Sequence, residues 1–164
     1  MNYTLKLFGA ALVMLFSLVI GRSYREYCGR RVEECEGFLS LLNHIIAEIS
    51  QFLSTPKDFF ESFECEALRR VGFLSEIEEG RDMSAAFETI KGRLSLSGET
   101  LERLSGFFSD FGRSYRDGEI ERTKYFRDEL ERTWIAEREA EEKRVKLVYT
   151  LLLALSLSIV ILLI

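Results

Sequence analysis

Residues 147–164 read LVYTLLLALSLSIVILLI, eighteen positions without a charged side chain. At about 1.5 Å per residue, a helix of this length reaches ~27 Å, close to the hydrocarbon thickness of a bilayer. Its few polar side chains are scattered around the helix, whereas a helix in a soluble core shows one polar face. The segment is therefore predicted to be a C-terminal transmembrane helix.

A second apolar run, LFGAALVMLFSLVIG, occupies residues 7–21. Its length is also typical of a secretory signal peptide, but the small residues of a cleavage site are missing before Arg22. If the Lys6 side chain extends to the membrane surface, the membrane-spanning segment can begin as early as Tyr3. We expect an uncleaved N-terminal transmembrane helix within residues 1–21, with a cleaved signal as the alternative.

Basic residues flank both apolar runs on their inner sides. Lys and Arg are enriched on the cytoplasmic side of membrane proteins. The sequence therefore predicts that residues 22–146 form a cytoplasmic domain and that both termini lie outside the cell membrane. The topology-setting residues are Arg22, Arg25, Arg30 and Arg31 after the first run and Lys143, Arg144 and Lys146 before the second.

Residues 22–146 are predicted to be all-α, an antiparallel bundle of about six helices carried on the two transmembrane helices. Apolar side chains recur every three or four positions from Val32 to Leu53. The sequence Thr55-Pro56-Lys57-Asp58 then predicts a new helix start. The later helices are expected at about 65–79, from Asp82 to Leu94, along an inner stripe from Leu101 to Tyr115, and from Glu119 onward.

The basic residues after the first run and the acidic residues before the second predict paired stems. Most of the charged residues in 22–31 are arginines, and most of those in 129–142 are glutamates. Antiparallel pairing of these stems predicts crosslinking between cysteines placed at Arg25 and Arg138. The alternative is a solvated acidic helix, with the arginines attracted to lipid.

Little in the sequence indicates catalysis. There is no GxxxxGK[ST] phosphate-binding loop and no paired metal-ligand motif, and the only histidine, His44, adjoins apolar Ile45. A net charge of −5 argues against nucleic acid as a partner. We expect no catalytic residue, cofactor or metal and a chain that is not an enzyme, with an enzyme of unrecognised chemistry as the alternative. The three cysteines, Cys28, Cys35 and Cys65, are expected to be free thiols.

Four stretches of the chain resemble the bacterial stage III sporulation protein AB family. They are LKLFGAALVMLFSLVIG (5–21), RRVEECEGFLSLLNHIIAEIS (30–50) followed by LSTPKDFF (53–60), FSDFGRSYRDGEIERTKYF (108–126), and the charged helix that ends in the terminal apolar run. In this family the turn carries a Leu-Gly pair, an aspartate and a glutamine. Phe111-Gly112 matches the pair, whereas Tyr115 stands at the aspartate and Glu119 at the glutamine.

The resemblance implies a membrane component of the channel complex between mother cell and forespore of an endospore-forming bacterium. It implies a cytoplasmic domain similar to that of the type II secretion inner-membrane platform protein, in the mother-cell membrane around the forespore. The expected partners are the cytoplasmic ATPase of the complex, stage III sporulation protein AA, other membrane subunits of the complex, further copies of the chain, and the lipid bilayer. The alternatives are a structural membrane-hairpin scaffold and a general type II secretion or type IV pilus platform protein.

Two turns are predicted to bind a partner, because tyrosine and arginine anchor many interfaces and turns present them on a rigid bundle. The GRSYRDG turn (residues 112–118) is the first choice and is expected at the membrane-distal end of the domain. The acidic turn (residues 75–82, SEIEEGRD) is the second choice, and two ordinary surface loops are the alternative. The candidate residues are Arg113, Tyr115 and Arg116 in the first turn and Glu76, Glu78, Glu79 and Asp82 in the second.

Overall fold

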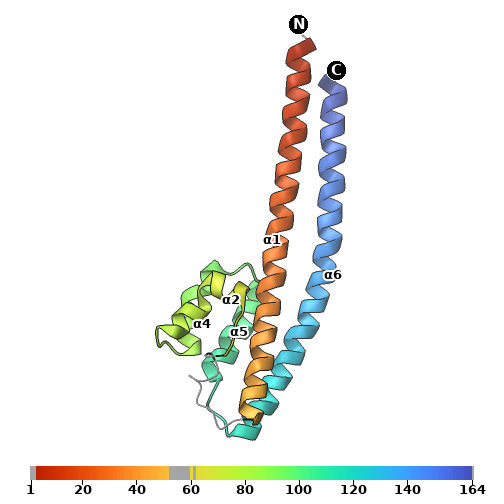
Figure 1. Ribbon diagram of the computed structural model, residues 1–164. Helices are drawn as coiled ribbons and strands as arrows, with labels where there is room; N and C mark the ends of the chain where they lie inside the picture. Colours follow the sequence, from red (N-terminus) through yellow and green to blue (C-terminus); the bar gives the residue numbers. More distant parts are fainter. Residues whose placement is uncertain (1–2, 52–59, 61, 164) are drawn as a thin grey trace. The chain divides into compact units, whose positions relative to one another are not determined.

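The structure, a computed structural model, describes residues 3–51, 60 and 62–163. These residues form helices and contain no strand, which confirms the all-α prediction. Figure 1 shows the order of the elements. They are α1 (Tyr3–Gln51), α2 (Glu66–Val71), α3 (Phe73–Glu78), α4 (Met83–Ile90), the 3₁₀ helix η2 (Lys91–Arg93), α5 (Gly98–Asp110) and α6 (Arg116–Leu163).

The chain divides into two compact units. The terminal unit comprises residues 1–29 and 137–164, and the central unit comprises residues 30–136. The long helices α1 and α6 each contribute to both units. Each unit is described below by itself.

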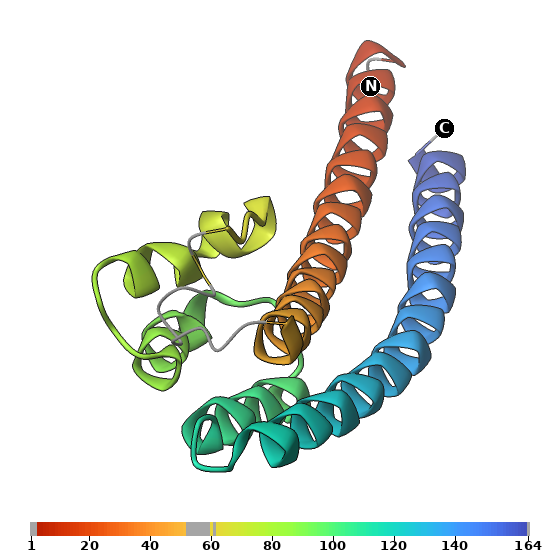
Figure 2. The ribbon, with the colours of Figure 1, turned by 60° about the horizontal axis from the view of Figure 1, so that its bottom comes forward.

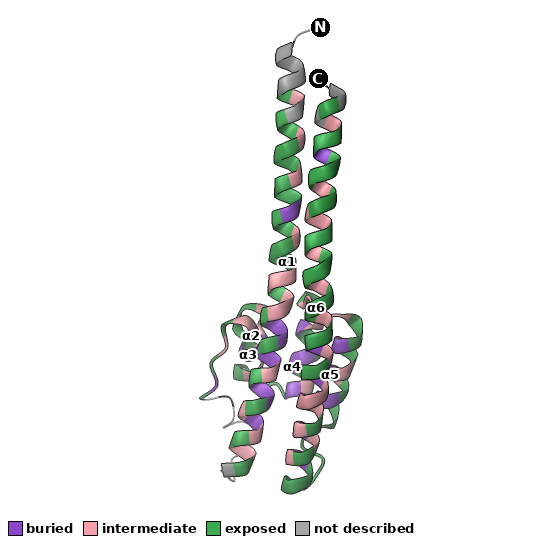
Figure 3. Cartoon of the chain, turned by 90° about the vertical axis from the view of Figure 1, so that its right-hand side faces the viewer, coloured by how far each residue is buried: buried purple, intermediate pink, exposed green. Residues whose placement is uncertain are grey.

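Four phenylalanine rings form the centre of the core of the central unit. The Phe38 ring centroid lies 5.7 Å from that of Phe73 and 5.8 Å from that of Phe87, both edge-on, and 6.1 Å from that of Phe108. Edge-on aromatic pairs add to the free energy gained from burying the rings. Figure 3 shows the buried positions on the facing sides of the helices in this unit. The three-to-four spacing of the sequence thus places α1 and α2–α5 around one apolar centre.

One predicted helix is two helices in the structure. The expected helix at about 65–79 breaks at Gly72, which adopts φ of 92° and separates α2 from α3. The Gly72 amide donates to the carbonyl of Arg69 at 3.0 Å, as in a glycine-terminated helix. Residues that carry a side chain rarely adopt this backbone conformation, which is why a glycine ends α2 here. The helix start predicted at Thr55-Pro56-Lys57-Asp58 lies outside the described residues.

The GRSYRDG turn is shorter than predicted, and Tyr115 does not belong to the inner stripe. Helix α5 ends at Asp110, Gly112 turns the chain with φ of 82°, and α6 begins at Arg116 rather than at Glu119. Figure 2 shows this tight connection between the two helices. The Tyr115 side chain is 95% exposed, whereas Phe107, which the predicted stripe omitted, is buried.

In the terminal unit, α1 and α6 run side by side and antiparallel (Figure 1). Gly21 faces Tyr149 so closely that an added Cβ would lie 3.0 Å from the tyrosine ring. Further along, the Cys28 thiol donates to the Glu141 carboxylate at 3.4 Å. The second contact joins the two predicted stems within this unit, whereas the first lies beyond them toward the chain ends.

The outward sides of the same helices expose large apolar side chains. Phe16 and Ile161, for example, are 70% and 69% exposed, while Ser156 is buried between the helices. Within the described residues, no helix is both long enough and apolar enough to cross a membrane.

The register of the terminal unit corrects the predicted crosslink between Arg25 and Arg138. Because Gly21 lies opposite Tyr149 and Cys28 opposite Glu141, the antiparallel register places Tyr24 at the level of Val145. In a variant with its three native cysteines changed to serine, cysteines at Tyr24 and Val145 should crosslink efficiently with a short bismaleimide. A cysteine pair at Tyr24 and Arg138, displaced by about two helical turns, serves as the control. Equal crosslinking of the two pairs would contradict this register.

Candidate functional site

The acidic turn and the GRSYRDG turn flank a single groove in the central unit. The groove has a volume of about 470 Å³ and a mostly apolar lining. Ile77 and Gly80 line it from the acidic turn, and Gly112 lines it from the GRSYRDG turn. The groove therefore reaches both predicted turns, and Asp82 is the one candidate partner-binding residue among the described residues of its lining. The other lining residues are Phe60, Arg81, Asp82, Met83, Ser84, Phe108, Ser109 and Phe111.

The arginines and the tyrosine of the GRSYRDG turn have different surroundings. Arg113 pairs with Asp110 at 3.0 Å, and both side chains remain more than half exposed. Tyr115 is almost fully exposed. Arg116 donates from Nε to the carbonyl of Ile49 at 2.8 Å and from Nη2 to that of Ser50. Because these carbonyls lie in the last turn of α1, Arg116 caps that helix and holds the start of α6 against it.

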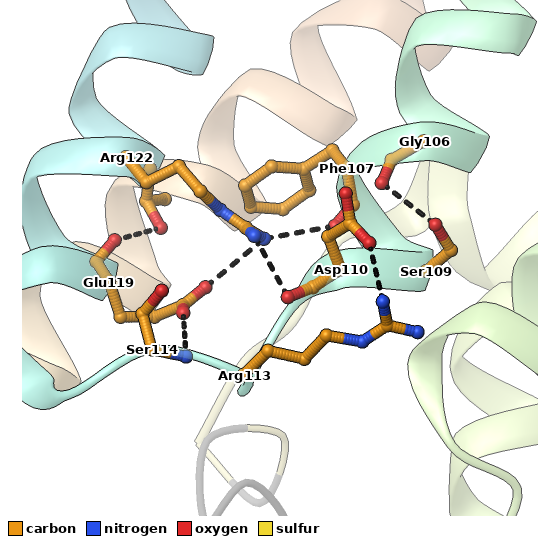
Figure 4. A network of polar contacts seen from close by, with 9 residues as sticks. Gly106, Phe107, Ser109, Asp110, Arg113, Ser114, Glu119 and Arg122 are labelled. Atoms are coloured by element: carbon orange, nitrogen blue, oxygen red, sulfur yellow. Dashed lines mark hydrogen bonds and ion pairs between the residues drawn. The ribbon is translucent and has the colours of Figure 1, made fainter.

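A buried carboxylate organises the backbone beside the turn (Figure 4). The Glu119 side chain is 5% exposed, accepts from the Ser114 amide at 3.4 Å and pairs with Arg122 at 3.3 Å. Arg122 in turn donates to the carbonyls of Asp110 at 2.8 Å and Phe107 at 3.2 Å. These carbonyls belong to the last turn of α5, so Arg122 satisfies acceptors that the helix leaves open. The network joins the end of α5, the turn and the start of α6.

The acidic turn uses half of its carboxylates to stabilise itself. Glu76 pairs with Arg81 at 2.6 Å, and Asp82 accepts from the Ala85 amide at 2.7 Å as the N-cap of α4. Glu78 pairs with Arg69 at 3.4 Å and Glu79 lies 3.9 Å from Arg81, and both side chains stay largely exposed. Glu78 and Glu79 are therefore the exposed acids of this turn.

A comparison with protein families gives one match. The profile of the stage III sporulation protein AB family matches residues 6–164, nearly the whole chain. The chain belongs to the stage III sporulation protein AB family. No curated protein and no solved structure matches it.

The network in Figure 4 occupies the part of the turn where this member differs from the family pattern described above. Phe111-Gly112 stands at the Leu-Gly pair of that pattern, and the positive φ of Gly112 gives a physical reason for the glycine. Glu119 replaces a glutamine and forms a network with Arg122 and Ser114. The sequence signal was the Glu119–Arg122 spacing of three, which places both side chains on one helical face.

The topology-setting residues lie in both units. Arg22 pairs with Glu26 at 3.0 Å, and Arg144 lies 3.7 Å from Glu141. The first pair lies within α1 and the second within α6. Both arginine side chains are exposed, so their positive charges remain at the surface. The others are exposed or half-buried: Arg25, Arg30, Arg31, Lys143 and Lys146.

No group of three or more His, Cys, Asp or Glu side chains among the described residues could hold a metal ion. The ring of His44 packs beside that of Phe63, with the centroids 5.1 Å apart. Cys28, Cys35 and Cys65 are thiols rather than members of disulfide bonds.

Glu34 is a buried carboxyl that the sequence did not single out. Burial raises the pKa of this group, although a hydrogen bond from the Ser95 amide and the charges of Arg30 and Arg70 offset part of the effect. A raised pKa in the folded state means that the folded chain binds the proton more tightly. The contribution of Glu34 to stability is therefore complete below its ordinary pKa of 4.5 and is lost as pH rises through the folded-state value.

We expect Glu34→Gln, which keeps an acceptor oxygen for Ser95, to remove this pH dependence. As pH rises from about 4.5 to 7.5, the parent should lose unfolding free energy relative to the variant. Denaturant titrations of both proteins at several pH values measure the difference. Parallel curves would show that Glu34 titrates normally in the folded chain.

Proposed function

We propose that this chain is a non-enzymatic platform subunit of a sporulation-specific, secretion-like channel complex. In this proposal it lies in the mother-cell membrane around the forespore and docks the cytoplasmic ATPase of the complex through the groove between its two turns. Membership of a sporulation family supports the biological setting. The observation that carries the docking role is the convergence of both turns on one apolar groove.

The groove combines features common to protein interfaces. Its apolar lining includes Phe60, Met83 and Phe111, and exposed Tyr115 and Arg113 lie in the adjoining turn. Interfaces commonly have an apolar centre, a polar rim, and Tyr or Arg anchors. We assign Tyr115 and Arg113 as anchors, with Glu78 and Glu79 as the acidic rim. Arg116 contributes by holding the turn in place.

Membrane attachment in this proposal rests on the two apolar runs and on the charges beside them. Residues 7–21 and 147–164 carry no charged side chain, and basic residues follow the first and precede the second. The exposed apolar sides of α1 and α6 in the terminal unit suit contact with lipid or with other membrane subunits. The proposed topology has two passes, both termini outside, and residues 22–146 in the cytoplasm.

Cysteine labelling tests the topology. A cysteine-free chain with one reporter cysteine before Lys6 should react with an impermeant maleimide in wall-less cells, whereas a reporter at Ser114 should be protected. The reverse pattern would show an inverted hairpin. A mature protein that begins near Arg22 would show a cleaved signal instead.

Copurification tests the docking role. The tagged full chain, isolated in detergent from sporulating cells, should bring along the ATPase of the complex. Recovery of membrane subunits without the ATPase, even after mild crosslinking, would favour a structural hairpin scaffold.

A further inference from the structure

Three arginines from three elements line a second cavity of the central unit. Arg30 comes from α1, Arg70 from α2 and Arg93 from η2, and the cavity has a volume of about 250 Å³. Two carboxylates, those of Glu33 and Glu34, also line it. Three cations against two carboxylates leave one excess positive charge. The remaining lining residues are Ala67, Val71, Gly72 and Ser95.

The two carboxylates already have partners, whereas two of the arginines have none within hydrogen-bond or ion-pair distance among the described residues. Glu33 pairs with Arg70 at 2.9 Å, and Glu34, itself 5% exposed, accepts from the Ser95 amide at 2.6 Å. Neither Arg30 nor Arg93 forms an ion pair or a side-chain hydrogen bond with any other residue that the structure describes. Burial raises the pKa of Glu34, whereas the charges of Arg30 and Arg70 lower it. Two guanidinium groups thus line one cavity without an ion pair or side-chain hydrogen bond to a described residue, although the charge of Arg30 acts on Glu34.

The break between α2 and α3 gives one of these arginines its place. A Cβ added at Gly72 would lie 3.4 Å from Nη1 of Arg93, so the guanidinium lies over the glycine backbone. Gly72 also has the positive φ that ends α2. The same glycine therefore turns the chain and leaves room for the guanidinium at the cavity.

We propose that this cavity binds a phosphate group, held by Arg30 and Arg93 with Arg70 as a third cation. A guanidinium presents a planar fork of donors that matches two phosphate oxygens, and such charge-assisted pairs are stronger than neutral hydrogen bonds. The source is either a soluble phosphomonoester or the headgroup of an anionic phospholipid. Both present the same chemistry to the arginines.

Calorimetric titration of the full chain in a non-ionic detergent tests this site. The probes are inorganic phosphate and dioctanoyl phosphatidic acid, with dioctanoyl phosphatidylcholine as the zwitterionic lipid control. The parent should bind at least one of the phosphate probes, and Arg30→Gln with Arg93→Gln should weaken that binding by about a hundredfold, or roughly tenfold per arginine. The matched control, Arg132→Gln with Arg138→Gln, removes the same charge from exposed positions of α6 outside the cavity and should leave affinity within about threefold.

The two probes distinguish the sources of the phosphate. Binding of both supports a soluble phosphomonoester, and binding of phosphatidic acid alone supports a lipid headgroup. Absence of binding by either probe, or equal weakening in both double variants, would overturn the proposal. If the Arg30/Arg93 variant fails to fold, Arg93→Gln alone changes an exposed side chain and must still weaken binding about tenfold.

Discussion

Phe38→Ala is expected to lower the unfolding free energy of the chain by about 3–5 kcal/mol. The Phe38 side chain is fully buried, and its ring lies beside those of Phe73, Phe87 and Phe108. Truncation removes the buried ring and leaves a cavity among side chains from α1, α3, α4 and α5, which have little freedom to close it. A single domain is commonly stable by only about 5–15 kcal/mol, so this loss is a large fraction of the total.

Denaturant titration of the full chain in detergent, followed by circular dichroism, measures the loss. Tyr125→Ala is the control, since the Tyr125 side chain is 72% exposed and its removal should change stability by no more than about 0.5 kcal/mol. Similar small effects of the two substitutions would show that the four rings do not form the centre of the core.

Arg122→Ala is expected to cost about 2–3 kcal/mol. The substitution removes two hydrogen bonds to the end of α5, the ion pair with buried Glu119, and a cation–π contact with the Phe107 ring, whose centroid is 5.5 Å away. Breaking a buried pair costs about 3–5 kcal/mol because one charge is left uncompensated. Arg122 is 31% exposed, so we discount this range for solvent screening.

A double variant separates the charge from the other contacts. Glu119→Gln keeps an acceptor for the Ser114 amide but removes the charge that Arg122 compensates. Arg122→Ala combined with Glu119→Gln should therefore be less destabilised, by about 1 kcal/mol or more, than the sum of the two single variants. Strict additivity would show that the buried charge contributes nothing. Arg113→Ala, which breaks an exposed pair, should cost less than about 1 kcal/mol.

Helical periodicity predicted much of the fold because it reports directly on burial. It identified the buried stripe of α1, including Phe38 and Ile45, and the buried face of α4. It failed at Gly72, because an apolar period of three to four residues can continue across a glycine that turns the chain. It also placed Tyr115 inside, because the spacing from Phe111 suited a helix that in fact ends at Asp110.

The two turns of the candidate site could be predicted from the sequence, but the groove between them could not. Glycine, charge and tyrosine content identified the acidic turn and the GRSYRDG turn, but nothing in their local sequence shows that they are adjacent. Their adjacency follows from the packing of α4 against both α3 and α5. The helix-capping role of Arg116 depends in the same way on the carbonyls of Ile49 and Ser50, more than sixty positions earlier.

Capture of the ATPase is the most direct test of the proposed platform role. The full chain in detergent, immobilised by a terminal tag, should retain purified stage III sporulation protein AA. The variant Arg113→Ala with Tyr115→Ala, in which Arg116 still caps α1, should retain at least about tenfold less, as expected when two interface anchors are lost. The control Tyr125→Ala with Arg132→Ala removes the same residue types from α6 and should capture like the parent. Undiminished capture by a folded Arg113/Tyr115 variant would contradict the docking surface proposed for this chain.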